Sequence, residues 1–431
     1  MRANSLQRSL LLAALASAFS TQANAIEDDE FSVYGFANLG VYYKDQAYTT
    51  IESYEDGEPR YFEEDTMLGL QISKPLSERT AATVQAIAAS NNDYVVETSL
   101  AFISHALDES TDLRAGRLRI PFFYYSEFLD VGYAYSWVRP SADVYSIPFK
   151  DYDGVDLTHR FSIGDSDAQL QINSGRRHKD IDLFGENYES ELNGIRGISL
   201  TMFSGDFSYR LGYQQTEMNL ALISDPNVEL AAATAAQTAA ANALGAGASA
   251  EQAQLAAAGA ALSTYEAADG YRRVDVAQAM ARFVGSSAGY DQAVIDDFNL
   301  DQKLARYFNI ATTYDNGSFS AVLEATHLNY DSGLLVDNFA WLAGIGQRFG
   351  DLTVQATYST SRDRVEQGDK GELQKLLGLQ GEDDSVSLAL RYDLDAATAL
   401  KLEMIHHDEE TNRGEPGRSA NLYRAALQLV F

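Results

Sequence analysis

The chain has 431 residues, contains no cysteine, and carries 62 acidic side chains against 32 Lys and Arg, a formal net charge of −30. The lack of cysteine excludes disulfides and thiol chemistry. The acidic balance argues against nucleic acid as a partner.

The first 25 residues have the three-part layout of a secretory signal peptide. Arg2 and Arg8 precede an apolar run at residues 10–16, and Ala23 and Ala25 are small residues at a cleavage position. The run is shorter than the ~20 residues of a transmembrane helix. We therefore expect an exported chain cut after Ala25, with a retained amphipathic anchor as the alternative.

Segments of about ten residues with alternating polarity recur through residues 26–431, as in 207–214, 352–359 and 385–392. Short turns rich in Gly, Asp, Asn, Ser or Pro separate them at 75–79, 107–110, 164–167, 204–206, 315–317, 350–351 and 393–395. Longer connections lie at about 44–63, 91–93, 120–152, 176–190, 219–303, 330–336, 364–381 and 410–419. Seven short turns alternating with eight longer connections predict sixteen strands.

An exported chain without a long apolar helix can still span a membrane if its sheet closes into a barrel, because closure pairs every backbone polar group. A soluble sandwich also alternates, but it rarely reaches so many strands. We therefore predict an all-β fold, a sixteen-stranded antiparallel transmembrane β-barrel over residues 26–431. The acidic charge then fits either solvated loops that bind divalent cations or cation preference in a pore.

Basic side chains recur within the predicted strands. A charge on the lipid face at the membrane midplane costs roughly 2–4 kcal/mol, so these cations should face the interior. They are Arg117, Arg119, Arg160, Arg210, Arg348 and Lys401. Candidate counter-charges in the third long connection, residues 120–152, are Glu127, Asp130 and Asp143. The alternative is that the arginines tether this loop by salt bridges.

The longest connection, residues 219–303, contains an Ala-rich stretch at 228–262. Alanine has the best helix propensity, so we expect one or two helices, broken around Gly245 and Gly247. They would form a helical extracellular loop that caps the barrel mouth or folds into it. A disordered tract is the alternative.

Two local motifs carry no site. Residues 285–289 match the nucleophile elbow, but they lie in a Gly/Ser-rich loop instead of a strand–helix turn. His406 and His407 would point to opposite faces of a strand and could not share one metal ion. We expect no catalytic residue, no metal and no cofactor.

The chain ends on a strand with an apolar face formed by Tyr423, Leu427, Leu429 and Phe431. This strand resembles the closing strand of bacterial outer-membrane barrels. The passage 112–123, with Arg117 beside Gly116, resembles the Gly-Arg strand before the inward-folded third loop of Gram-negative trimeric porins.

The resemblance implies a water-filled pore for passive diffusion of small hydrophilic solutes and ions. The pore would be narrowed where loop 120–152 folds inward, with loop acids opposite a basic wall. It also implies an outer-membrane homotrimer in contact with lipid and lipopolysaccharide, inserted by the outer-membrane assembly machinery.

Three other functions stay open. A substrate-selective channel could guide sugars or other ring-shaped solutes along loop aromatics. These are Phe122, Phe123, Tyr124, Tyr125, Tyr133, Tyr135 and Trp137. An outer-membrane hydrolase would need a nucleophile beside one of six histidines. An adhesin would have a plugged lumen.

Overall fold

The computed structural model describes residues 31–46, 57–183, 186–222, 226–249, 289–412 and 415–431, with scattered residues between 252 and 285. The predicted signal peptide, residues 1–25, lies outside the described residues, as do Ser286, Ser287 and Ala288 of the rejected elbow motif. Among the described residues, no helix combines the length and hydropathy needed to cross a membrane.

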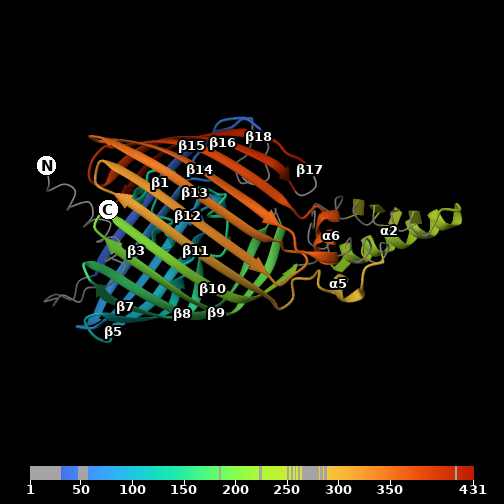
Figure 1. Ribbon diagram of the computed structural model, residues 1–431, viewed down its shortest axis with the longest axis horizontal. Coiled ribbons are helices and arrows are strands. Elements are labelled where there is room, and N and C mark those ends of the chain that lie inside the picture. Colours follow the sequence, from blue (N-terminus) through green and yellow to red (C-terminus); the bar gives the residue numbers. More distant parts are fainter. Residues whose placement is uncertain are drawn as a thin grey trace.

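The described chain forms one sheet whose first and last strands pair, so the sheet closes into a barrel (Figure 1). Two of its eighteen strands have only two residues each, which leaves the sixteen long antiparallel strands that the sequence predicts. The strands are β1 (Ser32–Lys44), β2 (Arg60–Tyr61), β3 (Met67–Ser77), β4 (Thr80–Ala89), β5 (Val96–Ala106), β6 (Thr111–Arg119), β7 (Asp151–Ile163), β8 (Ser166–Leu183), β9 (Glu186–Ser204), β10 (Phe207–Leu222), β11 (Lys303–Asp315), β12 (Phe319–Tyr330), β13 (Asp337–Phe349), β14 (Leu352–Arg364), β15 (Gly381–Asp393), β16 (Thr398–Asn412), β17 (Glu415–Pro416) and β18 (Ser419–Val430).

The closing seam joins β1 to β18. Leu39 lies opposite Leu427 and Ala37 opposite Leu429 in the antiparallel register. At its end, Phe431 and Gly35 exchange both backbone hydrogen bonds, at 2.7 and 2.9 Å. Tyr423 and Phe431 are exposed and lie on the same face of β18 as Leu427 and Leu429, whereas Gln428 points inward and is buried. The predicted faces of the terminal strand are confirmed.

Side chains alternate between an apolar outer face and a polar inner face. On β14, Tyr358 is exposed, while Thr353, Gln355 and Thr357 are buried inside. Large exposed apolar residues such as Leu211 of β10 lie on the outer face of other strands. A barrel in lipid has this polarity, the reverse of a soluble sandwich.

All seven predicted turns join neighbouring strands at one rim, which we call the short-turn rim; the opposite end is the long-loop rim. The predicted loop at 176–190 is wrong. There β8 continues to Leu183 and β9 begins at Glu186. Paired backbone groups extend this hairpin beyond the apolar segment, because polar side chains do not prevent strand pairing in water.

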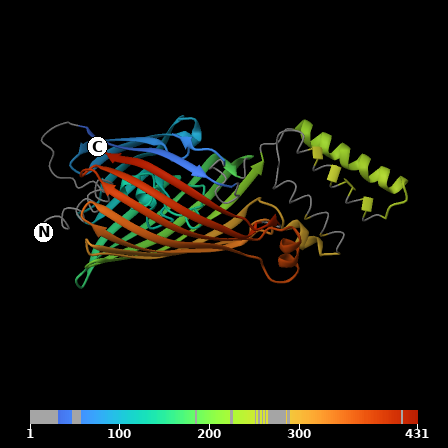
Figure 2. The ribbon, with the colours of Figure 1, turned by 90° about the horizontal axis from the view of Figure 1, so that it is seen from above.

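Helices gather at the long-loop rim, away from the chain's C-terminus: α2 (Pro226–Gly245), α5 (Gln292–Asp296) and α6 (Gly368–Leu376) (Figures 1 and 2). Phe298, Leu334 and Leu373 form an apolar cluster that packs the α5 and α6 segments together. The Asp297 carboxylate pairs with the ammonium groups of Lys303 and Lys370, each at an N–O distance of 2.6 Å. The helix α6 was not predicted from the sequence.

Candidate constriction site

The connection between β6 and β7 lies inside the barrel, where its side chains pack on inward-facing wall residues. It contains two short 3-10 helices, η2 (Ser126–Phe128) and η3 (Gly132–Ala134). Phe123 and Trp137 of this loop cluster with Leu342 of β13 and Ala389 of β15. We call residues 120–150 the constriction loop.

Lys401 of β16 anchors the middle of the constriction loop. Its side chain is fully buried, and its ammonium donates to the backbone carbonyls of Gly132, Tyr135 and Trp137 at 2.7, 2.5 and 2.7 Å. The three N–H donors of the ammonium match three carbonyls of this short loop segment. One wall residue therefore fixes six consecutive loop residues.

Glu324 of β12 anchors the loop from another part of the wall. Its carboxylate accepts from the backbone N–H of Tyr124 at 2.8 Å, from the Asn309 amide at 2.7 Å and from the Tyr145 hydroxyl. The side chain is fully buried. The carboxylate thus ties both ends of the loop to β11 and β12.

A third set of anchors comes from β14. The Trp137 indole N–H donates to Thr357 at 2.9 Å, and the Ser359 hydroxyl donates to Asp143 at 2.6 Å. Asp143 is buried. Of the predicted loop acids, Asp143 therefore contacts the Ser359 hydroxyl of the wall instead of an arginine.

Two more of the predicted cations, besides Lys401, hold the loop directly. Arg210 of β10 is buried and donates to the carbonyl of Pro121 at 2.8 Å. Arg119, at the end of β6, is buried and pairs with Asp130 at 2.5 Å. Both side chains combine a charge with a loop contact, so they serve as tethers.

Two further cations face the interior away from the loop. Arg160 of β7 pairs with Asp112 of β6 at 2.6 Å. Arg348 of β13 lies near the short-turn rim, where it donates to the carbonyl of Gly317 and lies 3.7 Å from Asp315.

Arg117 lies elsewhere: it pairs with Asp153 at 2.8 Å, on the face of β6 and β7 that carries the exposed Val155. This is the outer face, contrary to the expectation that strand cations point inward. Arg117 is two residues from the end of β6 at the long-loop rim, where the cost of an outward charge falls to about 0–1 kcal/mol.

A further inward-facing cation of β6 is Arg114, which was not among the residues predicted from the sequence. It makes a bidentate pair with Asp156 of β7, at 2.9 and 2.6 Å, and lies 3.6 Å from Glu127 of the loop. The alternation along β6 places Asp112 and Arg114 on one face, so the signal was present. Glu127 is the most exposed of the three predicted loop acids, with 32% of its side chain accessible.

Asp130 stays charged inside the barrel. Burial raises the pKa of Asp130, but the charges of Lys150 and Arg119 outweigh it, so the pKa of this carboxyl is well below its usual value. Burial also raises the pKa of Tyr125, Tyr135 and Tyr145, which keeps their hydroxyls neutral. The loop interior is therefore a desolvated layer with compensated charges.

Other wall residues that sequence reasoning missed hold the second half of the loop. Glu403 of β16 accepts from the backbone N–H of Val138 at 3.0 Å and from Arg424 of β18 at 2.7 Å. Arg391 of β15 donates to the carbonyls of Tyr133 and Tyr135 at 2.6 and 3.0 Å.

The loop aromatics mostly pack on one another. Phe123, Tyr135 and Trp137 are buried, and Tyr125 makes edge contacts with Tyr135 and Trp137 at ring-centroid distances of 5.9 and 5.8 Å. Such pairs stabilise the loop fold itself. The buried rings of Phe123, Tyr135 and Trp137 therefore do not line a path for ring-shaped solutes.

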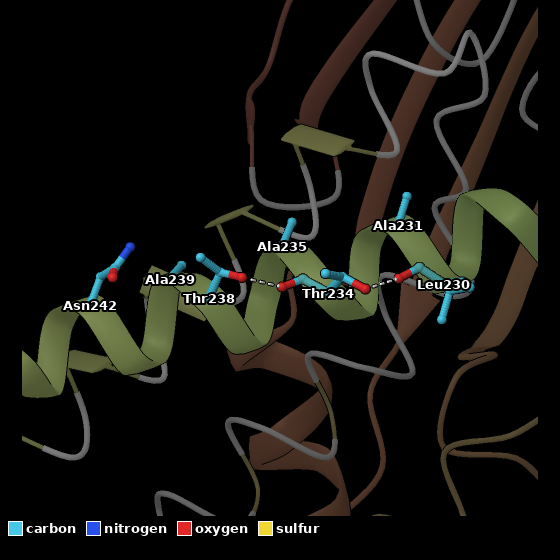
Figure 3. A pocket seen from close by; sticks show the side chains of 7 residues that line it. All are labelled: Leu230, Ala231, Thr234, Ala235, Thr238, Ala239 and Asn242. Carbon is cyan, nitrogen blue, oxygen red and sulfur yellow. Dashed lines mark hydrogen bonds between the residues drawn. The ribbon is translucent and has the colours of Figure 1, made fainter.

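A shallow groove runs along α2, outside the barrel (Figure 3). Small residues such as Ala231 and Ala235 line it, and the hydroxyls of Thr234 and Thr238 donate to carbonyls one turn back, at 2.6 and 2.8 Å. Both hydroxyls are bonded within the helix, and the described residues that line the groove include no ionisable group.

No family model matches the sequence, and no curated protein matches it. The fold is nevertheless similar to solved outer-membrane proteins. The outer membrane channel DcaP of Acinetobacter baumannii has a TM-score of 0.56 at 11% identity, covering 93% of this chain and 97% of that one. OmpT of Vibrio cholerae, an outer-membrane protein, has a TM-score of 0.53 at 10% identity, covering 95% and 100%.

The anion-selective porin from Comamonas acidovorans has a TM-score of 0.50 at 11% identity, covering 93% of this chain and 99% of that chain. Identities this low show the fold alone. The chain therefore has the closed sixteen-stranded barrel fold that outer-membrane porins and channels share.

Proposed function

We propose that this chain is an outer-membrane porin that passes small hydrophilic solutes and ions by passive diffusion. The observation that carries the proposal is the constriction loop held across the interior of a closed barrel by Lys401, Glu324 and Arg210. A sixteen-stranded barrel is wide enough for an aqueous channel, and an inward loop sets its narrowest point.

The charged pair of Arg114 and Glu127 supports selection by charge and polarity. It joins wall and loop at 3.6 Å, and both side chains keep some solvent exposure. Opposed charges between low-dielectric walls create a field that favours dipolar solutes and disfavours apolar ones. Arg160 and Arg348, which also face inward, extend this basic wall.

The apolar outer face supports insertion in the outer membrane, in contact with lipid and lipopolysaccharide and by way of the assembly machinery. A trimeric form of the structurally similar OmpT of Vibrio cholerae, with a TM-score of 0.52 at 9% identity, makes a homotrimer the natural assembly to test. The proposal involves no catalytic step.

The deciding experiment is single-channel recording of the purified protein in planar bilayers. We expect discrete ohmic steps, and a reversal potential in a salt gradient that reports the sign of the field at Arg114 and Glu127. Protein that inserts, as judged by protease protection, but conducts no ions would refute the proposal. Saturable blockade by one class of solute would indicate a substrate-selective channel instead.

A further inference from the structure

One group of side chains on the inner wall resembles a metal-binding set. Asp383 of β15 and Glu409 of β16 are directly opposite in the strand register, and His407 lies two residues from Glu409 on the same face. One potential ligand atom from each of the three lies within 4.8 Å of the others. His407 and Glu409 are almost completely buried, near the long-loop rim.

The imidazole of His407 is oriented by its other neighbours. Its Nδ1 lies 2.6 Å from the Ser385 hydroxyl and 3.6 Å from an Asp143 carboxylate oxygen. Its Nε2 is directed to the other side, 3.9 Å from Asp383 Oδ1. In metal sites a partner on one ring nitrogen fixes the tautomer and aims the other nitrogen at the ion.

The charges also favour a cation. Asp383 and Glu409 lie directly opposite on neighbouring strands, so their carboxylates can approach one ion from two sides. A divalent ion bound between them would be attracted by both charges. One imidazole nitrogen with two carboxylates is a donor set that suits borderline first-row ions such as Zn²⁺, which accept three protein ligands and a water.

The sequence predicts no shared metal ion at His406 and His407, because neighbouring residues of a strand point to opposite faces. His406 does point to the opposite face, where its Nδ1 lies 2.9 Å from the Asn421 side chain. The alternation that separates His406 from His407 is the same one that places Glu409 beside His407. The third member, Asp383, comes from the neighbouring strand and has no local signal.

We propose that Asp383, His407 and Glu409 bind one divalent transition-metal ion, with Zn²⁺ as the representative. The ion would bridge β15 and β16 beside Asp143 of the constriction loop. Ser385 and Asp143 act as positioning residues for the imidazole. This inference goes beyond the proposed channel and does not depend on it, because binding is measured in detergent without any conductance.

The test is a Zn²⁺ titration by calorimetry of the chelator-stripped, full-length protein in detergent. We expect one ion per chain, and at least about a tenfold loss of affinity in each of His407→Gln, Asp383→Asn and Glu409→Gln. The matched control is His406→Gln, one residue away on the other face, which should keep the wild-type affinity. An equal loss in His406→Gln, or no loss in His407→Gln, would overturn the proposal.

X-ray absorption of the Zn²⁺-loaded wild-type protein keeps the test decisive where a variant fails to fold. A first shell with one nitrogen and carboxylate oxygens supports the site. A shell with several imidazoles, or the lack of stoichiometric binding, contradicts it. Conductance recorded in parallel separates the two ideas, since a non-conducting barrel that binds Zn²⁺ would refute only the channel.

Discussion

The constriction loop and helix α2 are both parts of long connections between strands, yet they relate to the barrel in opposite ways. The loop is held by charged wall residues that bond to its backbone, as Lys401 does to Gly132, Tyr135 and Trp137. The helix extends beyond the barrel (Figures 1 and 2), and its Leu230 and Leu244 are exposed.

The difference follows from how each segment satisfies its backbone. An alanine-rich helix pairs its own N–H and C=O groups, so it needs nothing from the wall. A loop without regular structure leaves these groups open, and inside a barrel they must find partners on the wall. A loop that folds inward therefore requires buried charged or polar residues on the inner face that bond to its backbone, as Lys401 does.

Replacing Lys401 by Met should have the largest effect. The substitution keeps the volume but removes the ammonium that bonds to three loop carbonyls. The Trp137 carbonyl loses this donor outright, which costs about 1–3 kcal/mol for a buried unpaired group, while Tyr135 keeps its bond from Arg391 and Gly132 its long bond from the Tyr135 N–H. We expect a lower urea midpoint and a larger, noisier single-channel conductance, because the loop leaves the lumen. Lys375→Met, an exposed site on α6, is the control and should change neither quantity.

An unchanged conductance in Lys401→Met, with the expected loss of stability, would show that the loop does not limit the passage. That result would separate the tethering role of the wall charges from their role in permeation.

Local chemistry explains how much of the fold was predictable. Strands such as β14 follow from strict alternation, and turns such as Gly350–Asp351 follow from residues that tolerate tight backbone geometry. The anchors depend on partners far apart in the sequence: Glu324 binds Tyr124 across 200 positions. No pattern within one strand identifies such a partner.

The site residues show the same limit. The alternation along β12 places Glu324 on the inner face, since its neighbours Leu323 and Ala325 lie on the outer face. The same alternation does not indicate that Glu324 bonds to the constriction loop. Arg117 departs from the prediction because the cost of an outward charge depends on its depth in the membrane. Depth in a membrane depends on where a strand ends, and strand ends are set by pairing along the whole hairpin.

The stability that Asp130 contributes through its ion pairs with the loop and wall should decrease at acid pH. Its pKa is lowered in the folded protein, so its ionised form contributes stability above the unfolded pKa of about 3.9, and this contribution is lost as pH falls through the folded value. We expect Asp130→Asn to unfold more easily than the wild type at pH 7, with the gap narrowing below about pH 4.

Urea unfolding of both proteins at several pH values measures this gap. A difference that stays constant or widens toward acid would contradict the ion pair with Arg119 and Lys150.

Glu127→Gln should have a smaller effect, confined to selectivity. Removing a partly exposed negative charge 3.6 Å from Arg114 should shift the reversal potential toward anions. The permeability ratio should change by less than about tenfold, because a unit charge at such a distance in water contributes about 1 kcal/mol. Glu372→Gln on α6 is the matched control. A shift toward cations would exclude Glu127 from the passage.

The smallest effect on the barrel should come from α2. Ala233→Gly and Ala241→Gly replace exposed alanines, each at a cost to helix stability of about 1 kcal/mol. Circular dichroism should show less helix, while the urea midpoint of the barrel and its conductance stay at wild-type values. A helix that packed on the mouth would transmit its loss to the barrel, so a shifted midpoint would place α2 with the constriction loop, among the segments that the wall holds.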